Sequence, residues 1–189
     1  MKQKSPCAMI MMAIDTDKPG VNNALNGPDS GHWQSAMDAE VAQLQNLDMF
    51  ILVPLLADQK IIGCHWVLTT KHNSDGDIIK YKARLVAQGF SQVPGMDFDE
   101  TFSPVMRLES FQILLTIAIQ FDLEIHQMDI VGAYLNGDLI EEIYMKQIPG
   151  YEDGSSNVLR LKKTLYGLKQ AGRVWNRRLH KALTELNYT

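Results

Sequence analysis

One carboxylate, Asp129, stands between Met128 and Ile130 at the end of a stretch that begins at Glu124 and predicts a β-strand. An ionised carboxylate among apolar neighbours is unfavourable unless it is paired or bound to a cation. Two interpretations follow. Asp129 can supply an oxygen ligand to a divalent cation, or it can be a structural acid that a nearby lysine or backbone donors satisfy.

A row of cations forms a second candidate group. The stretches 65–71 and 78–87 flank Asn73-Ser-Asp-Gly76, and such an Asp-Gly turn predicts a β-hairpin. In the second strand Lys80, Lys82 and Arg84 share one face, while apolar residues share the other. Lysine and arginine on one face can bind phosphate groups. Surface strands also carry lysine simply to discourage edge pairing, so the pattern alone leaves both interpretations open.

Charge is segregated along the chain. Residues 60–92 carry five Lys and Arg against two Asp, residues 121–153 carry eight acids against one Lys, and residues 154–189 carry eight Lys and Arg against one Glu. An acidic centre between basic flanks is compatible with cations and phosphates as ligands. Ordinary solvated faces would give the same pattern.

Several predicted elements must position these groups. A helix begins at Asp29-Ser30, and its apolar residues Trp33, Met37, Val41, Leu44 and Leu47 recur every three or four positions. The apolar stretch 110–119 predicts a buried helix, residues 132–137 a turn, and the stretches 143–145 and 158–161 strands. A basic helix follows from about Lys169. Residues 1–28 are interpreted as a poorly ordered leader or linker, and residues 29–189 as the folded unit.

Composition excludes several classes of protein. The chain has 189 residues, 46% of them apolar, and a net charge of -4, which is typical of a globular chain. Cys7 and Cys64 cannot form a disulfide framework and match no zinc-site spacing, so we expect an intracellular location. The apolar runs are shorter than the roughly 20 residues that span a bilayer, so no membrane helix is expected.

Six phrases occur in a fixed order along the chain. They are Lys82-Ala-Arg-Leu-Val-Ala-Gln-Gly-Phe-Ser-Gln92, Glu100-Thr-Phe-Ser-Pro-Val105, His126-Gln-Met-Asp-Ile130, Ala133-Tyr-Leu-Asn-Gly137, Glu142-Ile-Tyr-Met145 and Leu165-Tyr-Gly-Leu-Lys-Gln-Ala171. From about Trp33 to its last residue, the chain thereby resembles the reverse transcriptase of copia-type retrotransposons.

The resemblance implies a right-hand polymerase of mixed α+β class, in which this chain supplies the fingers and the first part of an antiparallel palm sheet with packed helices. It further implies RNA-templated DNA synthesis by two-metal nucleotidyl transfer in the parent enzyme. Mg²⁺, a template–primer of RNA or DNA and deoxynucleoside triphosphates are the implied cofactor and partners. We expect no membrane association, and a cytoplasmic or nuclear location.

The resemblance also suggests roles for individual residues. Asp129 would be the first palm aspartate and a Mg²⁺ ligand, assisted by the carbonyl of Ile130. Tyr134 would close the sugar pocket against a ribose 2′-hydroxyl, although an ordinary half-buried tyrosine is the alternative. The remaining predicted nucleotide-binding residues lie on the hairpin and before the last helix, and Lys169 among them can equally be a solvated residue: Lys71, Lys82, Arg84, Tyr166, Gly167 and Lys169.

Departures from the family pattern qualify these expectations. Thr69 stands where a lysine is frequent on the first hairpin strand. The family's Tyr-x-Asp-Asp motif, which supplies two of the three metal-binding carboxylates, does not occur in the sequence. One carboxylate cannot hold two Mg²⁺ ions, so we predict that the isolated chain is inactive. A non-catalytic nucleic-acid-binding remnant and a decayed structural remnant are the alternatives.

Overall fold

The computed structural model describes residues 18–57 and 59–188, so most of the predicted leader lies outside the described residues. Within its described part, α2 (Val21–Leu25) forms a short helix whose Ala24 is buried. This helix packs against α3 (Ser30–Asn46), the helix that the sequence predicted from Asp29-Ser30. The predicted apolar face is confirmed, because α3 buries Trp33, Met37, Val41 and Leu44.

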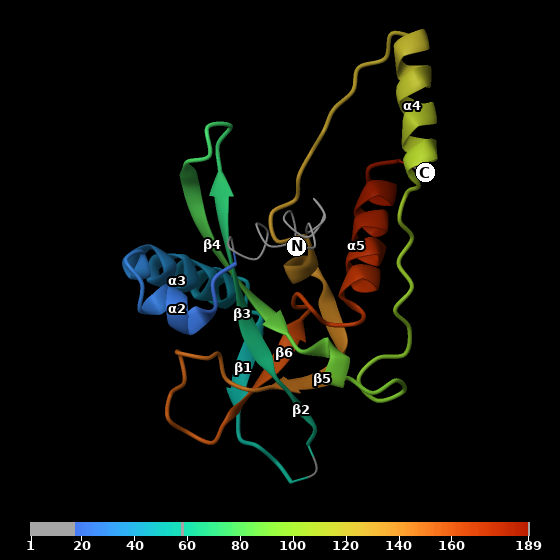
Figure 1. Cartoon of the computed structure of the whole chain (residues 1–189). Coiled ribbons are helices and arrows are strands. Elements are labelled where there is room, and N and C mark those ends of the chain that lie inside the picture. The colour runs from blue at the N-terminus through green and yellow to red at the C-terminus, as the bar shows by residue number, and fades with distance from the viewer. Residues whose placement is uncertain (1–17, 58, 189) are drawn as a thin grey trace, which may run out of the picture.

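The predicted hairpin is also confirmed. It consists of β3 (Cys64–His72) and β4 (Ile78–Ala87), which pair in antiparallel fashion as a separate two-stranded sheet. Its apolar face packs against α3, with Ala83, Leu85 and Ala87 buried. The distal end projects away from this contact, as Figure 1 shows, and Ile79 there is 63% exposed. The hairpin therefore has an anchored base and an open tip.

A second sheet has four strands in the order β1-β6-β5-β2. They are β1 (Phe50–Val53), β2 (Ile61–Ile62), β5 (Asp138–Met145) and β6 (Val158–Lys163). β6 pairs antiparallel with β1 and β5, whereas β2 pairs parallel with β5. The sheet is thus mixed rather than purely antiparallel as predicted, within an α+β fold. Its buried side chains share one core with α3 and the hairpin.

Three further elements connect this core to the candidate site. The 3₁₀ turn η1 (Gly89–Ser91) follows β4, and the 3₁₀ turn η2 (Ala133–Asn136) precedes β5. The basic helix α5 (Ala171–Glu185) packs its first turns against η2. In the described residues, no helix is long and apolar enough to cross a membrane.

The helix α4 (Leu108–Gln120) corrects one prediction. The sequence predicted a buried helix here, yet none of its residues is buried, and Figure 1 shows it extending from the body between two long connections. Apolar side chains cover most of the surface of α4, apart from a polar stripe of Glu109, Gln112, Thr116 and Gln120, and such a helix normally packs its apolar face against other elements. The apolar stretch identified the helix correctly, but burial depends on a partner that no described element supplies.

The predicted strand over residues 124–130 is wrong. This segment has no regular structure, and each of its residues is exposed. A single extended segment is not stable without a neighbour to share its backbone hydrogen bonds. The residue types of this stretch favour a strand, whereas pairing requires a second strand that the described residues do not place beside it.

The exposure of α4 leads to a direct prediction. Ile113 is 60% exposed, so we expect Ile113→Lys to change the free energy of unfolding by less than about 0.5 kcal/mol. The matched change Leu44→Lys in α3 should lower it by several kcal/mol, because Leu44 is fully buried. Urea denaturation followed by circular dichroism compares the two. Equal destabilisation would show that α4 is covered in solution.

Candidate functional site

The hairpin gathers four cations on one face. Cross-strand partners share a face, and the register pairs Lys71 with Lys80, Thr69 with Lys82 and Val67 with Arg84. Burial, with the added repulsion of Arg84, Lys71 and Lys80, holds the pKa of Lys82 below its ordinary value. Mutual repulsion of this kind is relieved when an anion binds.

An aromatic cluster lies beside the base of this cationic face. The guanidinium carbon of Arg84 lies 5.5 Å from the ring centroid of Tyr166, within the range of a cation–π contact. The Tyr166 ring in turn meets the Tyr134 ring edge-on, with 5.8 Å between centroids. Three predicted site residues from segments far apart in the sequence therefore lie together.

The position of Tyr166 depends on the close approach of two backbones. The Ala87 N–H donates to the Tyr166 carbonyl over 2.7 Å. Gly167 follows with a φ of +90°, and a Cβ at this position would lie 2.2 Å from the Ala87 carbonyl oxygen. Glycine is required on both counts. The backbone at Gly167 therefore lies directly against β4.

Tyr134 is held by contacts of its backbone. It lies in η2, a turn that begins directly after Gly132, and Gly132 has a φ of +62°. The buried Thr164 hydroxyl donates to the Tyr134 carbonyl, and the Thr164 N–H donates to the Gly137 carbonyl over 2.7 Å. The residue as a whole is nevertheless 39% exposed. A fixed backbone with an accessible ring is suited to contact a ligand.

Lys169 is tied to the rest of the fold by its backbone N–H and not by its charged side chain. Its N–H donates to Gln92 Oε1 over 2.8 Å, while its side chain is exposed. Gln92 donates to Gln170 over 3.2 Å, and Gln170 donates to the Asp97 carbonyl over 3.0 Å. Sequence reasoning missed this buried amide network, although both glutamines lie within the six recognised phrases.

Sequence reasoning also missed Glu40 on α3. Its Oε1 accepts a hydrogen bond from the Leu85 N–H over 3.3 Å, at the edge of β4 that does not pair with β3. Burial raises the pKa of the Glu40 carboxyl, and the Leu85 hydrogen bond and the charges of Arg84 and Lys82 oppose this. Nothing in the local sequence of α3 distinguishes Glu40 from a solvated helix residue.

Asp129 and Ile130 are not brought to this cluster by any contact. Both are exposed, and among the described residues no hydrogen bond or ion pair involves the Asp129 carboxylate. Throughout residues 18–57 and 59–188, no three His, Cys, Asp or Glu side chains are grouped so that they could hold a metal ion. The residues present therefore do not form a Mg²⁺ site, and the metal-binding role of Asp129 stays a prediction.

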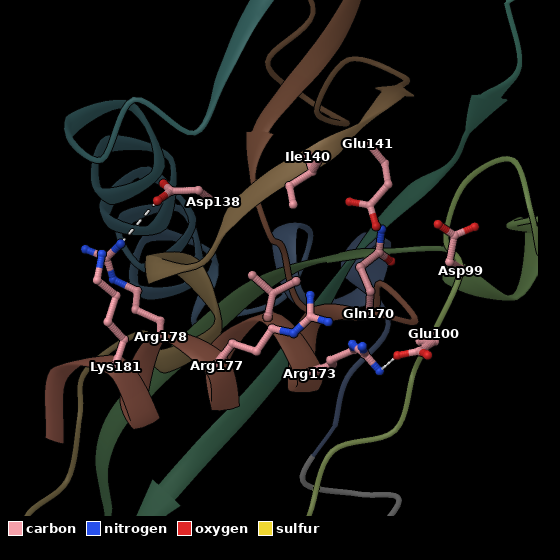
Figure 2. Close-up of a pocket in the computed structure, with 11 residues that line it drawn as sticks. Asp99, Glu100, Asp138, Ile140, Glu141, Gln170, Arg173, Arg177, Arg178 and Lys181 are labelled. Atoms are coloured by element: carbon pink, nitrogen blue, oxygen red, sulfur yellow. Dashed lines mark hydrogen bonds and ion pairs between the residues drawn. The ribbon is translucent and has the colours of Figure 1, made fainter. Parts of the chain in front are cut away.

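A pocket of about 570 Å³ opens between α5 and β5. Figure 2 shows the basic side chains of α5 on one wall and acids on the opposite wall. Arg178 pairs with Asp138 over 3.2 Å, and Arg173 pairs with Glu100. Because acids on the opposite wall partly neutralise α5, the pocket favours polyanions less than the hairpin does.

Comparisons with a family model and with individual proteins point to the same family. The family model described as reverse transcriptase (RNA-dependent DNA polymerase) matches residues 47–189. The retrovirus-related Pol polyproteins from transposons RE1 and RE2 of Arabidopsis thaliana are 42% and 43% identical over 82% and 80% of this chain. That from transposon TNT 1-94 of Nicotiana tabacum is 40% identical over 88% of it. The chain spans 11% to 13% of the length of these relatives. No solved structure matches it.

Proposed function

We propose, because the chain belongs to the reverse transcriptase (RNA-dependent DNA polymerase) family and is related to copia-type Pol polyproteins, that residues 29–189 form the fingers and the first part of the palm of a retrotransposon polymerase. The parent polyprotein would copy RNA into DNA, with a template–primer and deoxynucleoside triphosphates as its partners. The chain itself would contribute part of the nucleotide-binding site.

The convergence of Arg84, Tyr166 and Tyr134 carries this proposal. Lys82 and Arg84, with Lys71 beside them, would bind the triphosphate, because lysine supplies point charges and arginine a planar fork. Tyr134 would exclude a ribose 2′-hydroxyl, and its accessible ring on a fixed backbone supports that role. Tyr166 and Gly167 would support the nucleotide and template. Lys169 is the weakest candidate, since its side chain makes no contact with the cluster in the described residues.

Magnesium enters the proposal through the family alone. Asp129, with the Ile130 carbonyl, is the residue that would ligate Mg²⁺ in the parent enzyme, but the described residues do not assemble a metal site around it. The inactivity expected of the 189-residue chain stays a prediction.

Nucleotide binding tests the proposal directly. We expect the double variant K82A/R84A to bind deoxyadenosine triphosphate at least about tenfold more weakly than the unaltered chain, because two charge-assisted contacts are lost. The loss should diminish as salt is raised from 50 to 200 mM, since screening weakens the contacts in the unaltered chain. Isothermal titration calorimetry measures the affinity.

The matched control removes two cations from α5. R177A/K181A changes the net charge equally and should bind the nucleotide within about twofold of the unaltered chain, because these two residues line the pocket between α5 and β5 and not the cationic face of the hairpin. An equal loss in both variants would show that binding depends on net charge alone. That result would favour the alternative of a non-catalytic nucleic-acid-binding remnant.

A further inference from the structure

The outer edge of β4 is held at two positions. This edge does not pair with β3, so its amide groups need other partners. The Leu85 N–H donates to Glu40 Oε1 over 3.3 Å, and the Ala87 N–H donates to the Tyr166 carbonyl over 2.7 Å. One partner is a side chain from α3 and the other is backbone from the segment after β6.

The first of these bonds fixes the peptide group that carries Arg84. The Leu85 amide belongs to the peptide bond joining Arg84 to Leu85, and Leu85 itself is fully buried. A peptide plane is rigid, so its orientation determines where the Arg84 side chain leaves the strand. The second bond fixes the Tyr166 backbone relative to the same strand edge. Together they define the geometry in which the guanidinium lies 5.5 Å from the Tyr166 ring centroid.

We infer that Glu40 is a positioning residue: its carboxylate holds the Arg84–Leu85 peptide so that the Arg84 guanidinium is placed over the Tyr166 ring, oriented to receive a phosphate. The placement of the guanidinium follows from contacts within the chain. That this guanidinium binds a phosphate rests on the proposed function.

The acceptor and the charge of Glu40 have opposite effects on anion binding. As an acceptor, Glu40 orients Arg84 and so favours binding. As a negative charge near Arg84 and Lys82, it competes with an incoming phosphate. Glu40→Gln keeps the acceptor oxygen and removes the charge, whereas Glu40→Ala removes both. Comparing these two variants isolates the positioning role.

The first experiment needs no ligand. Protons of a side chain held over an aromatic ring are shielded, so the Arg84 δ and ε protons should resonate upfield in the NMR spectrum of the full chain. We expect E40Q to keep this shift and E40A to lose it, while Y166L serves as the reference without a ring. If E40A keeps the shift and its spectrum otherwise remains that of the folded chain, the positioning role is overturned.

The second experiment measures binding of inorganic tripolyphosphate to the same variants. We expect E40A to bind about fivefold more weakly than E40Q, the effect of one lost orienting hydrogen bond. In the R84A background this difference should vanish, because Glu40 would act through Arg84. A difference that persists in R84A would contradict the inference.

The two experiments separate the inference from the proposed function. If E40A loses the ring shift but R84A binds tripolyphosphate as well as the unaltered chain, Glu40 positions Arg84 and the proposed phosphate site is wrong. If R84A loses binding but E40A and E40Q are equal in shift and affinity, the proposed site stands and the role of Glu40 is refuted.

Discussion

Replacing Gly167 by alanine is expected to lower the free energy of unfolding by about 3 kcal/mol or more, since it combines backbone strain with a steric clash in the core. The new Cβ would lie 2.2 Å from the Ala87 carbonyl oxygen and 2.7 Å from Val86 Cγ1. Neither atom can move freely, because both belong to the hairpin strand that packs on α3. Urea denaturation of the purified variant measures the loss.

Gly150 offers a matched control for this substitution. Its φ of +86° is close to the +90° of Gly167, but nothing lies within 4 Å of the Cβ position. Gly150→Ala should therefore cost only the conformational penalty of about 1 kcal/mol for an L-residue in the left-handed region. If the two variants lose equal stability, the close approach of residues 166–167 to β4 does not exist in solution.

Truncating Leu85 to alanine should produce the second large effect, a loss of about 3 kcal/mol in the free energy of unfolding. Leu85 is fully buried on the face of β4 that packs against α3. Its removal leaves a cavity that the surrounding side chains fill only in part. Thermal and urea denaturation of the variant both report the change.

Ile79 provides the comparison, because it lies in the same strand at the open tip of the hairpin. It is 63% exposed, so Ile79→Ala should cost less than about 1 kcal/mol. The contrast tests whether the hairpin is anchored at its base and open at its tip. A loss at Ile79 as large as that at Leu85 would mean that the tip is also covered, and that the cationic face is less accessible than the structure shows.

Local patterns were sufficient to predict the elements that make their own contacts. The spacing of Trp33, Met37, Val41 and Leu44 predicted both α3 and the face that it buries. The Asp-Gly turn and the alternation after it predicted the hairpin and its cationic face. In each case the signal lies within 20 residues of sequence, and the packing partner is present in the described chain.

Predictions that required a distant partner were less successful. The helix expected over residues 110–119 is present as residues 108–120, but its burial was predicted from apolarity alone. The strand expected at 124–130 lacks a neighbour to pair with. Conversely, the structural roles of three residues depend on hydrogen bonds between positions 45 or more apart in the sequence, which no local pattern encodes. These residues are Gln92, Gln170 and Glu40.

Part of the candidate site could still be identified without coordinates. Tyr134, Tyr166 and Arg84 were selected by resemblance from three separate phrases, and the structure places them in contact. Their roles in binding nucleotide remain to be tested. Asp129 was selected in the same way, yet its surroundings depend on residues that the described chain does not bring to it.

The sheet order has a consequence for how the protein is made. β1 pairs with β6, and more than 100 residues separate Val53 from Val158 in the sequence. At ribosomal speeds of roughly 5–20 residues per second, β1 waits for several seconds or longer before its partner emerges. During translation the apolar strand Phe50–Val53 is therefore open to chaperones and to neighbouring nascent chains, and slow codons between these strands would prolong that interval.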